Sequence, residues 1–268
     1  MNPRDSIRTD HGASLITNRY EIISRYKHLR MVSVALNYKM SSRLSKEDRL
    51  EGGRKLGMLY KGGLWLDSED QISVLIDYCL FDLRREGRNA IEQYLIDSPP
   101  DPDSDEMTCL QAMRHAKYSV FIVESAERGL GVTVTDLLSR EHMLVVDLGF
   151  GSTAKPGLLF ASRLLFHDGF AMMTGASLAV GMLPPEHRDA MANKLLRAAG
   201  PDIHFDPAPV IRGCLRGGSS SQVKYLEPGK FIGLDQVASR GRPAKVSGNA
   251  FCPCGSGKKY KHCCMNFV

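Results

Sequence analysis

Apolar residues recur with helical spacing in the first part of the chain, most clearly after Ser68. Ser68 and Gln71 fit a capping box, which is a common helix start. The i, i+3, i+4, i+7 spacing of one buried helical face is followed by Ile72, Leu75, Ile76, Cys79, Leu80 and Leu83. Gly87 then supplies a stop. We expect helices from residue 14 to about 117, and a helical bundle over residues 1–117.

Two further helices are expected before the pattern changes. One spans residues 90–96 and ends before Pro99 and Pro100. The other is capped by Ser104 and runs to about Ala116. Together with the helix after Ser68, these pieces suggest a small helical bundle.

From residue 118 the pattern changes to short β-rich runs separated by turn residues. The runs cover residues 118–124, 131–138, 142–148, 158–166 and 170–174. Glycine, proline and polar residues lie between them, as tight connections require. A helix is expected from Pro184 and Pro185 to about Ala199. Residues 118–200 are therefore expected to form a small antiparallel barrel or curled sheet plus a helix.

The end of the chain differs from the rest in composition and charge. Residues 201–248 are rich in Gly, Ser, Pro and basic residues, which predicts a flexible basic linker before a C-terminal segment at 249–268. From residue 211 onward there are ten Lys or Arg but only two acidic residues, Glu227 and Asp235, which gives +8. The whole chain carries +5, so residues 1–210 carry −3. This asymmetry favours an acidic or polyanionic partner for the tail.

Overall composition is that of a folded protein, with 43% hydrophobic and 24% charged residues in a chain of 268. We read no run of about 18 apolar residues that would span a membrane. The first residues lack the apolar segment of a signal peptide, so we expect a cytosolic protein. The fold class expected is α+β. Seven cysteines occur, four of them within residues 252–264, which favours metal binding over a disulfide framework.

The segment 252–264 reads C-P-C-G-S-G-K-K-Y-K-H-C-C and holds four thiols in thirteen residues. Structural zinc is tetrahedral and is satisfied by four thiolates. Such a centre carries a net charge of −2, which Lys258, Lys259 and Lys261 can offset. Gly255 and Gly257 let the backbone turn sharply, so that amide N–H groups can point at sulfur. The cofactor expected is Zn²⁺.

This segment resembles the SEC-C motif, the zinc knuckle at the C-terminus of the bacterial SecA translocase. The resemblance covers about residues 249–264 and implies the zinc ligands Cys252, Cys254, Cys263 and Cys264. The last of these often has His in its place in SecA. Gly248, Phe251 and Met265 depart from the usual flanking residues, which affects the turns and any partner contact there. An alternative is that His262 replaces Cys263 or Cys264 as a ligand.

Other candidate sites have more ordinary explanations. Residues 149–153 and 213–218 superficially resemble phosphate-binding loops but do not follow the P-loop pattern, so we read them as turn and linker. The remaining thiols, Cys79, Cys109 and Cys214, are candidate nucleophiles, yet we expect none of them to be catalytic. Cys79 lies on the predicted apolar face, where it behaves as a small buried hydrophobe. The outward charges expected on the β-rich segment are Arg128, Arg140, Lys155 and Arg163, interleaved with Glu124, Glu127, Asp136, Glu141, Asp147 and Asp168. That mixture would attract phosphate poorly.

The main hypothesis is a non-enzymatic, zinc-binding adaptor that docks on an acidic protein surface through its knuckle. The partner-binding residues would be Lys258, Lys259, Tyr260 and Lys261. The resemblance implies a docking use, because the similar knuckle of SecA engages the acidic chaperone SecB. A second hypothesis is RNA or ribosome binding by the same tail, with Phe251, Tyr225 and Tyr260 as stacking residues. A third, an enzyme with the knuckle as accessory, lacks a catalytic constellation, and the sequence does not indicate the oligomeric state.

Overall fold

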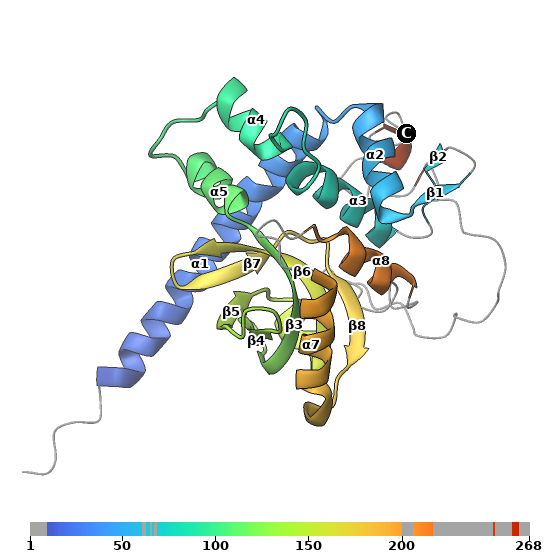
Figure 1. Ribbon diagram of the computed structural model, residues 1–268. Coiled ribbons are helices and arrows are strands. Elements are labelled where there is room, and N and C mark those ends of the chain that lie inside the picture. Colours follow the sequence, from blue (N-terminus) through green and yellow to red (C-terminus); the bar gives the residue numbers. More distant parts are fainter. Residues whose placement is uncertain are drawn as a thin grey trace, which may run out of the picture.

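The computed structural model describes residues 10–60, 63–64, 66, 69–199, 206–216, 249 and 259–262. It confirms the expected α+β class: a group of helices packs on a small β-barrel (Figure 1). The helices before the barrel are α1 Asp10–Ser41, α2 Lys46–Leu56, α3 Glu69–Phe81, α4 Ala90–Asp97 and α5 Asp105–Arg114. Between α2 and α3 lies a short antiparallel pair, β1 Leu59–Tyr60 and β2 Gly63–Leu64.

Local sequence explains where several of these helices begin. The Ser104 hydroxyl accepts a hydrogen bond from the backbone N–H of Met107 at 3.1 Å, so Ser104 caps α5 as predicted. Asn89 forms a capping box with Glu92 at the start of α4. Ser45 and Asp48 form another at the start of α2. These caps satisfy backbone N–H groups that the first helical turn leaves without partners.

The helix after Ser68 is buried more completely than its apolar stripe predicts. Leu75 and Cys79 on the stripe are buried, as expected. However, Val74, Asp77 and Tyr78 on the other sides of α3 are buried too. The reason is that α3 lies at the centre of the helical group, with α1, α2 and α4 all in contact with it. A central helix has no face left for solvent, so its polar residues need partners inside the protein.

The β-rich segment forms a closed ring of five strands with one extra strand. The strands are β3 Lys117–Glu127, β4 Gly131–Asp136, β5 His142–Val146, β6 Leu158–His167, β7 Phe170–Met173 and β8 Leu178–Met182. The ring order is β3–β4–β5–β7–β6, and β6 pairs back with β3 to close it. All pairings are antiparallel except β5–β7, which is parallel at Val145 and Ala171. The extra strand, β8, pairs with the first part of β6 and was not expected from the sequence.

The barrel interior is filled by side chains. Phe121 of β3 and Phe160 of β6 have ring centroids 5.5 Å apart inside the ring. The short helix α6 (Phe150–Thr153) adds Phe150, whose ring lies 5.1 Å from that of Phe160. A Cβ on Gly151 would lie 2.6 Å from the Glu127 carbonyl oxygen, so only glycine lets α6 approach β3 this closely. Residues 149–153 therefore pack on the barrel, in line with a structural role.

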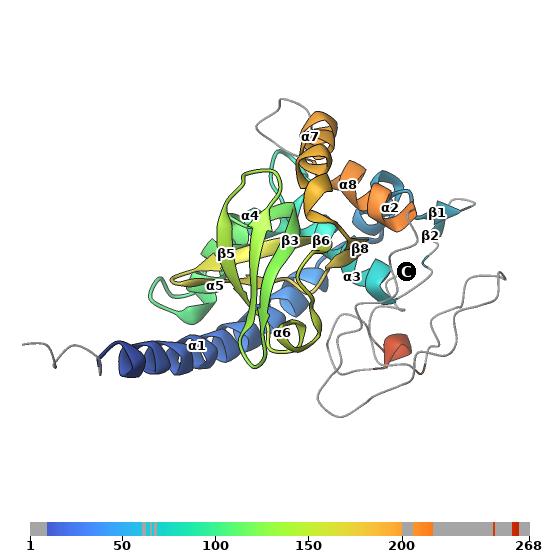
Figure 2. The same ribbon diagram turned by 90° about the horizontal axis from the view of Figure 1, so that it is seen from below.

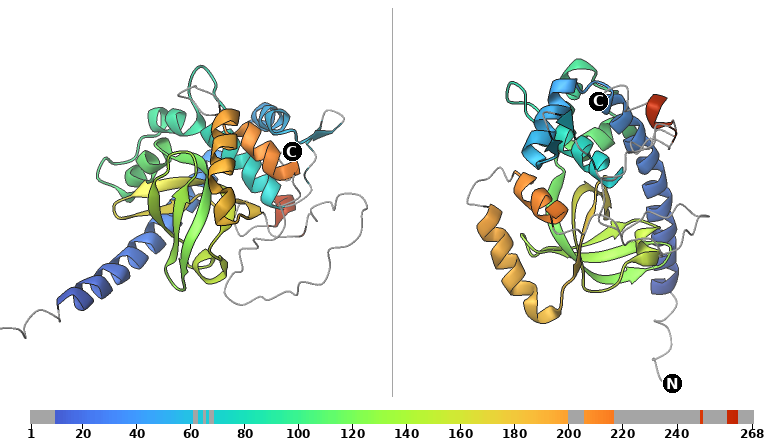
Figure 3. Two further views of the ribbon diagram at one scale, coloured as in Figure 1. Left: turned by 60° about the horizontal axis from the view of Figure 1, so that its bottom comes forward. Right: turned by 90° about the vertical axis from the view of Figure 1, so that its right-hand side faces the viewer.

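The outer face of the barrel is buried against helices. Tyr118, Val120 and Ile122 alternate with the inward residues of β3 and join the same hydrophobic core as α1, α3 and α5. Helices α1 and α7 (Arg188–Ala199) flank the barrel on opposite sides (Figures 2 and 3). The turn η1 (Pro185–His187) precedes α7, as the two prolines predict.

Part of the predicted linker is a packed helix. Residues 208–216 form α8 (Ala208–Arg216), which contacts α2, α7 and β8. Ala208 and Ile211 are buried in the main core. Just before this helix, Asp206 Oδ1 accepts a hydrogen bond from the Ala208 N–H, the first of the helix, at 2.9 Å. The chain therefore stays with the body at least to residue 216, and division of the chain into four domains stays a prediction.

Candidate functional site

The predicted zinc ligands Cys252, Cys254, Cys263 and Cys264, together with Lys258, lie outside the described residues. Within the segment the structure describes Asn249 and a short helical turn, η2 (Tyr260–His262). The backbone N–H of His262 donates to the carbonyl oxygen of Lys259 at 2.9 Å, which closes this turn. The chain thus bends between the two cysteine pairs, which a chelating loop requires.

The side chains of this turn differ in their exposure to solvent. Lys259 and His262 are exposed, whereas Lys261 is half-buried. Of the predicted partner-binding residues, Lys259 is therefore the described cation best placed to meet a partner. The exposure of His262 does not decide between the all-cysteine ligand set and the alternative with His262.

Elsewhere, the described ranges hold no cluster of three or more His, Cys, Asp or Glu side chains able to bind a metal. Burial raises the pKa of the Cys79 thiol to about 12 and that of Cys214 to about 11, and it also raises the pKa of Cys109. These three thiols stay protonated at neutral pH, so they are poor nucleophiles and poor metal ligands. The four cysteines of residues 252–264 are the donor set whose chemistry fits zinc.

One predicted surface charge, Arg163, is in fact buried. Its side chain on β6 is 4% exposed, and its Nε donates to Asp77 Oδ2 of α3 at 2.9 Å. A second nitrogen donates to Asp82 just after α3. The guanidinium also lies 4.5 Å from the centre of the Phe81 ring. Arg163 points from β6 to α3 and is buried there, so its charge is unavailable to any partner of the barrel.

The same correction applies to two of the acidic residues expected to face outward. Asp136 is fully buried, and its Oδ1 accepts a hydrogen bond from Ser119 at 2.5 Å. Asp147 is also buried, and its Oδ1 accepts from the backbone N–H of Phe150 at 2.8 Å. Both carboxylates therefore stabilise turns of the barrel rather than contribute to its surface charge.

Burial has a strong effect on the acidity of this cluster. It raises the pKa of Asp82 to about 7, although Arg163 opposes the shift. Two carboxylates share one guanidinium, and protonation of Asp82 makes the group neutral. The cluster of Asp77, Asp82 and Arg163 therefore joins the helices to the barrel. Its Asp82 carboxyl group loses a proton near neutral pH.

A second polar cluster lies on the outer face of the barrel beside α7. The Thr135 hydroxyl donates to Glu124 at 2.7 Å and lies 2.9 Å from His142 Nδ1. Arg188, the first residue of α7, donates to the same carboxylate at 3.0 Å. Burial by itself would raise the pKa of Glu124, but the hydrogen bonds from Thr135 and Arg188 outweigh it and lower the pKa. A carboxylate so well paired is a weak base, and the cluster holds α7 on the barrel.

Two charged residues within apolar runs mark the buried cluster in the sequence. Asp77 interrupts the apolar run of α3, and Arg163 interrupts that of β6. A charge isolated within an apolar run needs an opposite charge in the fold. Two such residues of opposite sign are therefore candidates for a buried pair.

Fold and tail together define a class: an α+β body, built from helices on a closed barrel, followed by a cysteine-rich segment. Residues 20–199 match a family described as "Family of unknown function (DUF7986)", and residues 249–266 match the SEC-C motif. The chain belongs to this DUF7986 family, whose match covers the helical group and the barrel. The SEC-C match confirms the resemblance of the tail.

Curated relatives are SecA proteins, and they match over limited stretches. The chain is 26% identical to SecA of Acidiphilium cryptum over 177 residues, which is 60% of this chain and 19% of that protein. It is 53% identical to SecA of Treponema pallidum over 78 residues, covering 29% of this chain and 8% of that SecA. The match to SecA of Nitratiruptor sp. is 43% over 44 residues, covering 16% and 5%. The chain thus spans less than a fifth of the SecA length, and no solved structure matches it.

No helix within the described ranges is long and apolar enough to cross a membrane.

Proposed function

We propose that the protein is a zinc-binding cytosolic adaptor that docks on an acidic protein surface through its SEC-C segment. The observation that carries the proposal is the SEC-C match at residues 249–266, with four thiols and three lysines in one short loop. Cys252, Cys254, Cys263 and Cys264 would hold Zn²⁺ and so give the loop a fixed shape.

Charge supports docking by the tail rather than by the body. The tail from residue 211 carries a formal +8, and a zinc ion at +2 with four thiolates at −4 leaves +6. The body from residue 1 to 210 carries −3, and Arg163 on its barrel is buried in an ion cluster. An acidic partner is thus attracted to the tail. Lys259, just before η2, is exposed and is one described cation that could meet such a partner.

Zinc binding is tested by measuring metal content of the purified, reduced full-length chain. We expect about one zinc per chain, because four thiolates fill a tetrahedral site. Cys252→Ser and Cys263→Ser should lose the metal. Cys214→Ser is the matched control, since this half-buried thiol on α8 should leave metal content unchanged. Equal zinc content in the wild type and in both ligand variants contradicts the proposal.

Docking is tested by capture of partners with a triple variant, Lys258, Lys259 and Lys261 all changed to Gln. We expect unchanged zinc content, weaker capture and a flatter dependence on salt, because fewer charges are paired on binding. The matched control changes Lys224, Lys230 and Lys245 to Gln, which removes the same charge from the tail outside the SEC-C match. Capture reduced equally by both triple variants contradicts a docking surface on the knuckle.

Nucleic acid is the competing partner, because a charge of +8 would also attract RNA or a ribosome. Treatment of the lysate with nuclease before capture separates the two. Retention of the captured proteins supports a protein surface, and their loss shows that nucleic acid carried them.

A further inference from the structure

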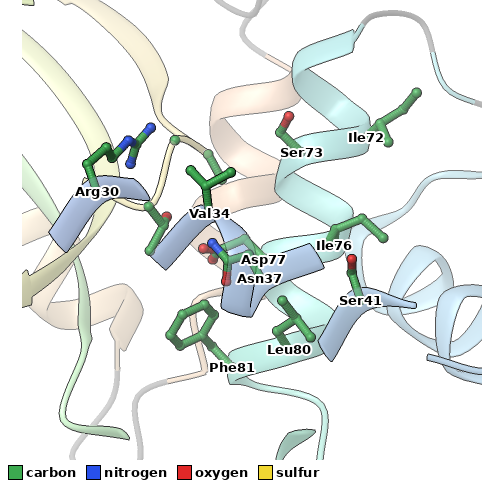
Figure 4. Close-up of a pocket in the computed structure, with 13 residues that line it drawn as sticks. Arg30, Val34, Asn37, Ser41, Ile72, Ser73, Ile76, Asp77, Leu80 and Phe81 are labelled. Carbon is green, nitrogen blue, oxygen red and sulfur yellow. The ribbon is translucent and has the colours of Figure 1, made fainter. Parts of the chain in front are cut away.

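A cavity of about 240 Å³ lies in the body between α1, α3 and the turn that joins β7 to β8. Figure 4 shows its wall, with side chains from α1 and α3 facing each other across it. The apolar part of the wall comes from both helices, and consists of Val34 of α1 with Ile72, Ile76, Leu80 and Phe81 of α3. The cavity is independent of the SEC-C segment, and the proposed function gives it no role.

Three polar atoms in the wall of this cavity are buried and have no hydrogen-bond partner among the described residues. They are Asn37 Oδ1 of α1, Asp77 Oδ1 of α3, and Thr174 Oγ1 in the turn after β7. Asp77 is 6% exposed. Buried polar atoms are nearly always paired, because each unpaired one costs roughly 1–3 kcal/mol. Three of them around one cavity indicate that something binding there supplies donors.

The chemistry of these atoms specifies the kind of donor. Two of them, on Asn37 and Asp77, accept hydrogen bonds only, and the Thr174 hydroxyl can accept one. Among the described residues, Asp77 pairs with the guanidinium of Arg163, which it shares with Asp82. A primary ammonium group has three donors, no acceptor and a positive charge, so it has one donor for each of the three atoms.

We propose that this cavity binds the primary ammonium group of a small organic molecule. Asn37, Asp77 and Thr174 accept its hydrogen bonds, and the aliphatic wall receives its carbon chain. An apolar cavity of about 150 Å³ accommodates benzene, so about 240 Å³ accommodates a molecule of roughly ten non-hydrogen atoms.

The ammonium group has two possible sources, a simple alkylamine or an amino acid. Arg30, on α1 two helical turns before Asn37, also lines the cavity, and its Nη1 donates to the Met173 carbonyl oxygen at 2.5 Å. Its remaining N–H groups offer a partner to a ligand carboxylate, which an amino acid has and an alkylamine lacks. The two sources are separated by the probes used.

The test is isothermal titration calorimetry on the full-length chain with isoamylamine, leucine and isoamyl alcohol. Isoamylamine and isoamyl alcohol have the same carbon skeleton, so they differ only in the head group. Binding of isoamylamine, of leucine or of both, with no binding of the alcohol, supports the proposal. If leucine binds more tightly than isoamylamine, Arg30 pairs with the carboxylate of the ligand. Absence of binding by both amines, or equal binding of the alcohol, overturns it.

Variants show whether the binding uses this cavity. Thr174→Val keeps the shape and removes the hydroxyl, and should weaken amine binding by at least about tenfold, since a hydrogen bond to a charged group is lost. Thr108→Val on α5, outside the cavity, is the matched control and should bind normally. Asp77→Asn should abolish binding, but it also disturbs Arg163, so Asn37→Leu provides a second acceptor variant.

Thermal stability distinguishes a ligand-binding role of Thr174 from a structural one. Without ligand, Thr174→Val should melt at the wild-type temperature or above it, because it replaces an unpaired buried hydroxyl by a methyl group. With isoamylamine present, the wild type should gain thermal stability and Thr174→Val should gain less. Equal affinity for the amine in wild type, Thr174→Val and Asn37→Leu overturns the assignment to these residues.

Discussion

Replacing Arg163 by Met should destabilise the body strongly. The guanidinium is 4% exposed and bonds to Asp77 and Asp82. Methionine fills much of its volume but leaves two buried carboxylates without a cation. Breaking a buried ion pair by removing one partner costs about 3–5 kcal/mol, and the stacking on Phe81 adds to this. Because these ion pairs join the α3 region to β6, their loss should lower the free energy of unfolding of the whole body.

Urea unfolding followed by circular dichroism measures this change, at pH 8 because that pH lies above the pKa of about 7 of Asp82. Arg43→Met is the matched control: Arg43 also stacks on an aromatic ring, Tyr94 at 4.6 Å, but is exposed. It should cost under about 1 kcal/mol. A variant that combines Arg163→Met with Asp77→Asn and Asp82→Asn should recover part of the stability, since no charge is then left buried. A loss under about 1 kcal/mol for Arg163→Met alone would falsify the account of this cluster.

Three further predictions concern pH, metal and capping. Asp82 has a pKa of about 7 in the folded protein, above its ordinary 3.8, so its stabilising contribution is full below pH 4 and lost as the pH rises through 7. The free energy of unfolding should therefore fall less between pH 5 and 8 in Asp82→Asn than in the wild type, and parallel profiles would contradict the shift. Chelation of zinc should leave the main thermal transition nearly unmoved, because the body has its own core; a large drop in calorimetry would show that the knuckle packs on it. Ser104→Ala should cost about 1 kcal/mol through loss of the α5 cap, against no change for Ser152→Ala on α6, as measured by urea unfolding.

Local signals in the sequence predicted most of the body correctly. The strands β3 to β7 lie where alternating and apolar runs indicate, and Ser104 caps α5 as its position suggests. The tail was identified for the same reason, since the cysteine spacing and glycines of the SEC-C motif are all contained within a few residues. Such features depend only on residues that are close together in the chain, so a single sequence is enough to predict them.

The missed features depend on distant contacts. α8 contains Pro209 and Gly213 and lies in a basic stretch, so its composition suggests a linker; burial of Ile211 against the body makes it a helix. β8 includes Gly181 at a φ of 143°, and its pairing with β6 determines its extended form. Asp77 and Arg163 are 86 residues apart. The cavity forms where α1, α3 and the β7–β8 turn come together. The periodicity of apolar residues along the sequence does not predict this tertiary contact.

The parallel pairing of β5 with β7 limits the order in which the barrel can assemble. Antiparallel neighbours along the chain can pair through short turns, but two parallel strands cannot. Between β5 and β7 the chain forms α6 and β6, and β6 is the antiparallel hairpin partner of β7. The seam between Val145 and Ala171 joins residues farther apart in sequence than those paired in the β3–β4, β4–β5 and β6–β7 hairpins, so we expect it to form after these hairpins. Changes confined to that seam should accelerate unfolding more than they slow refolding.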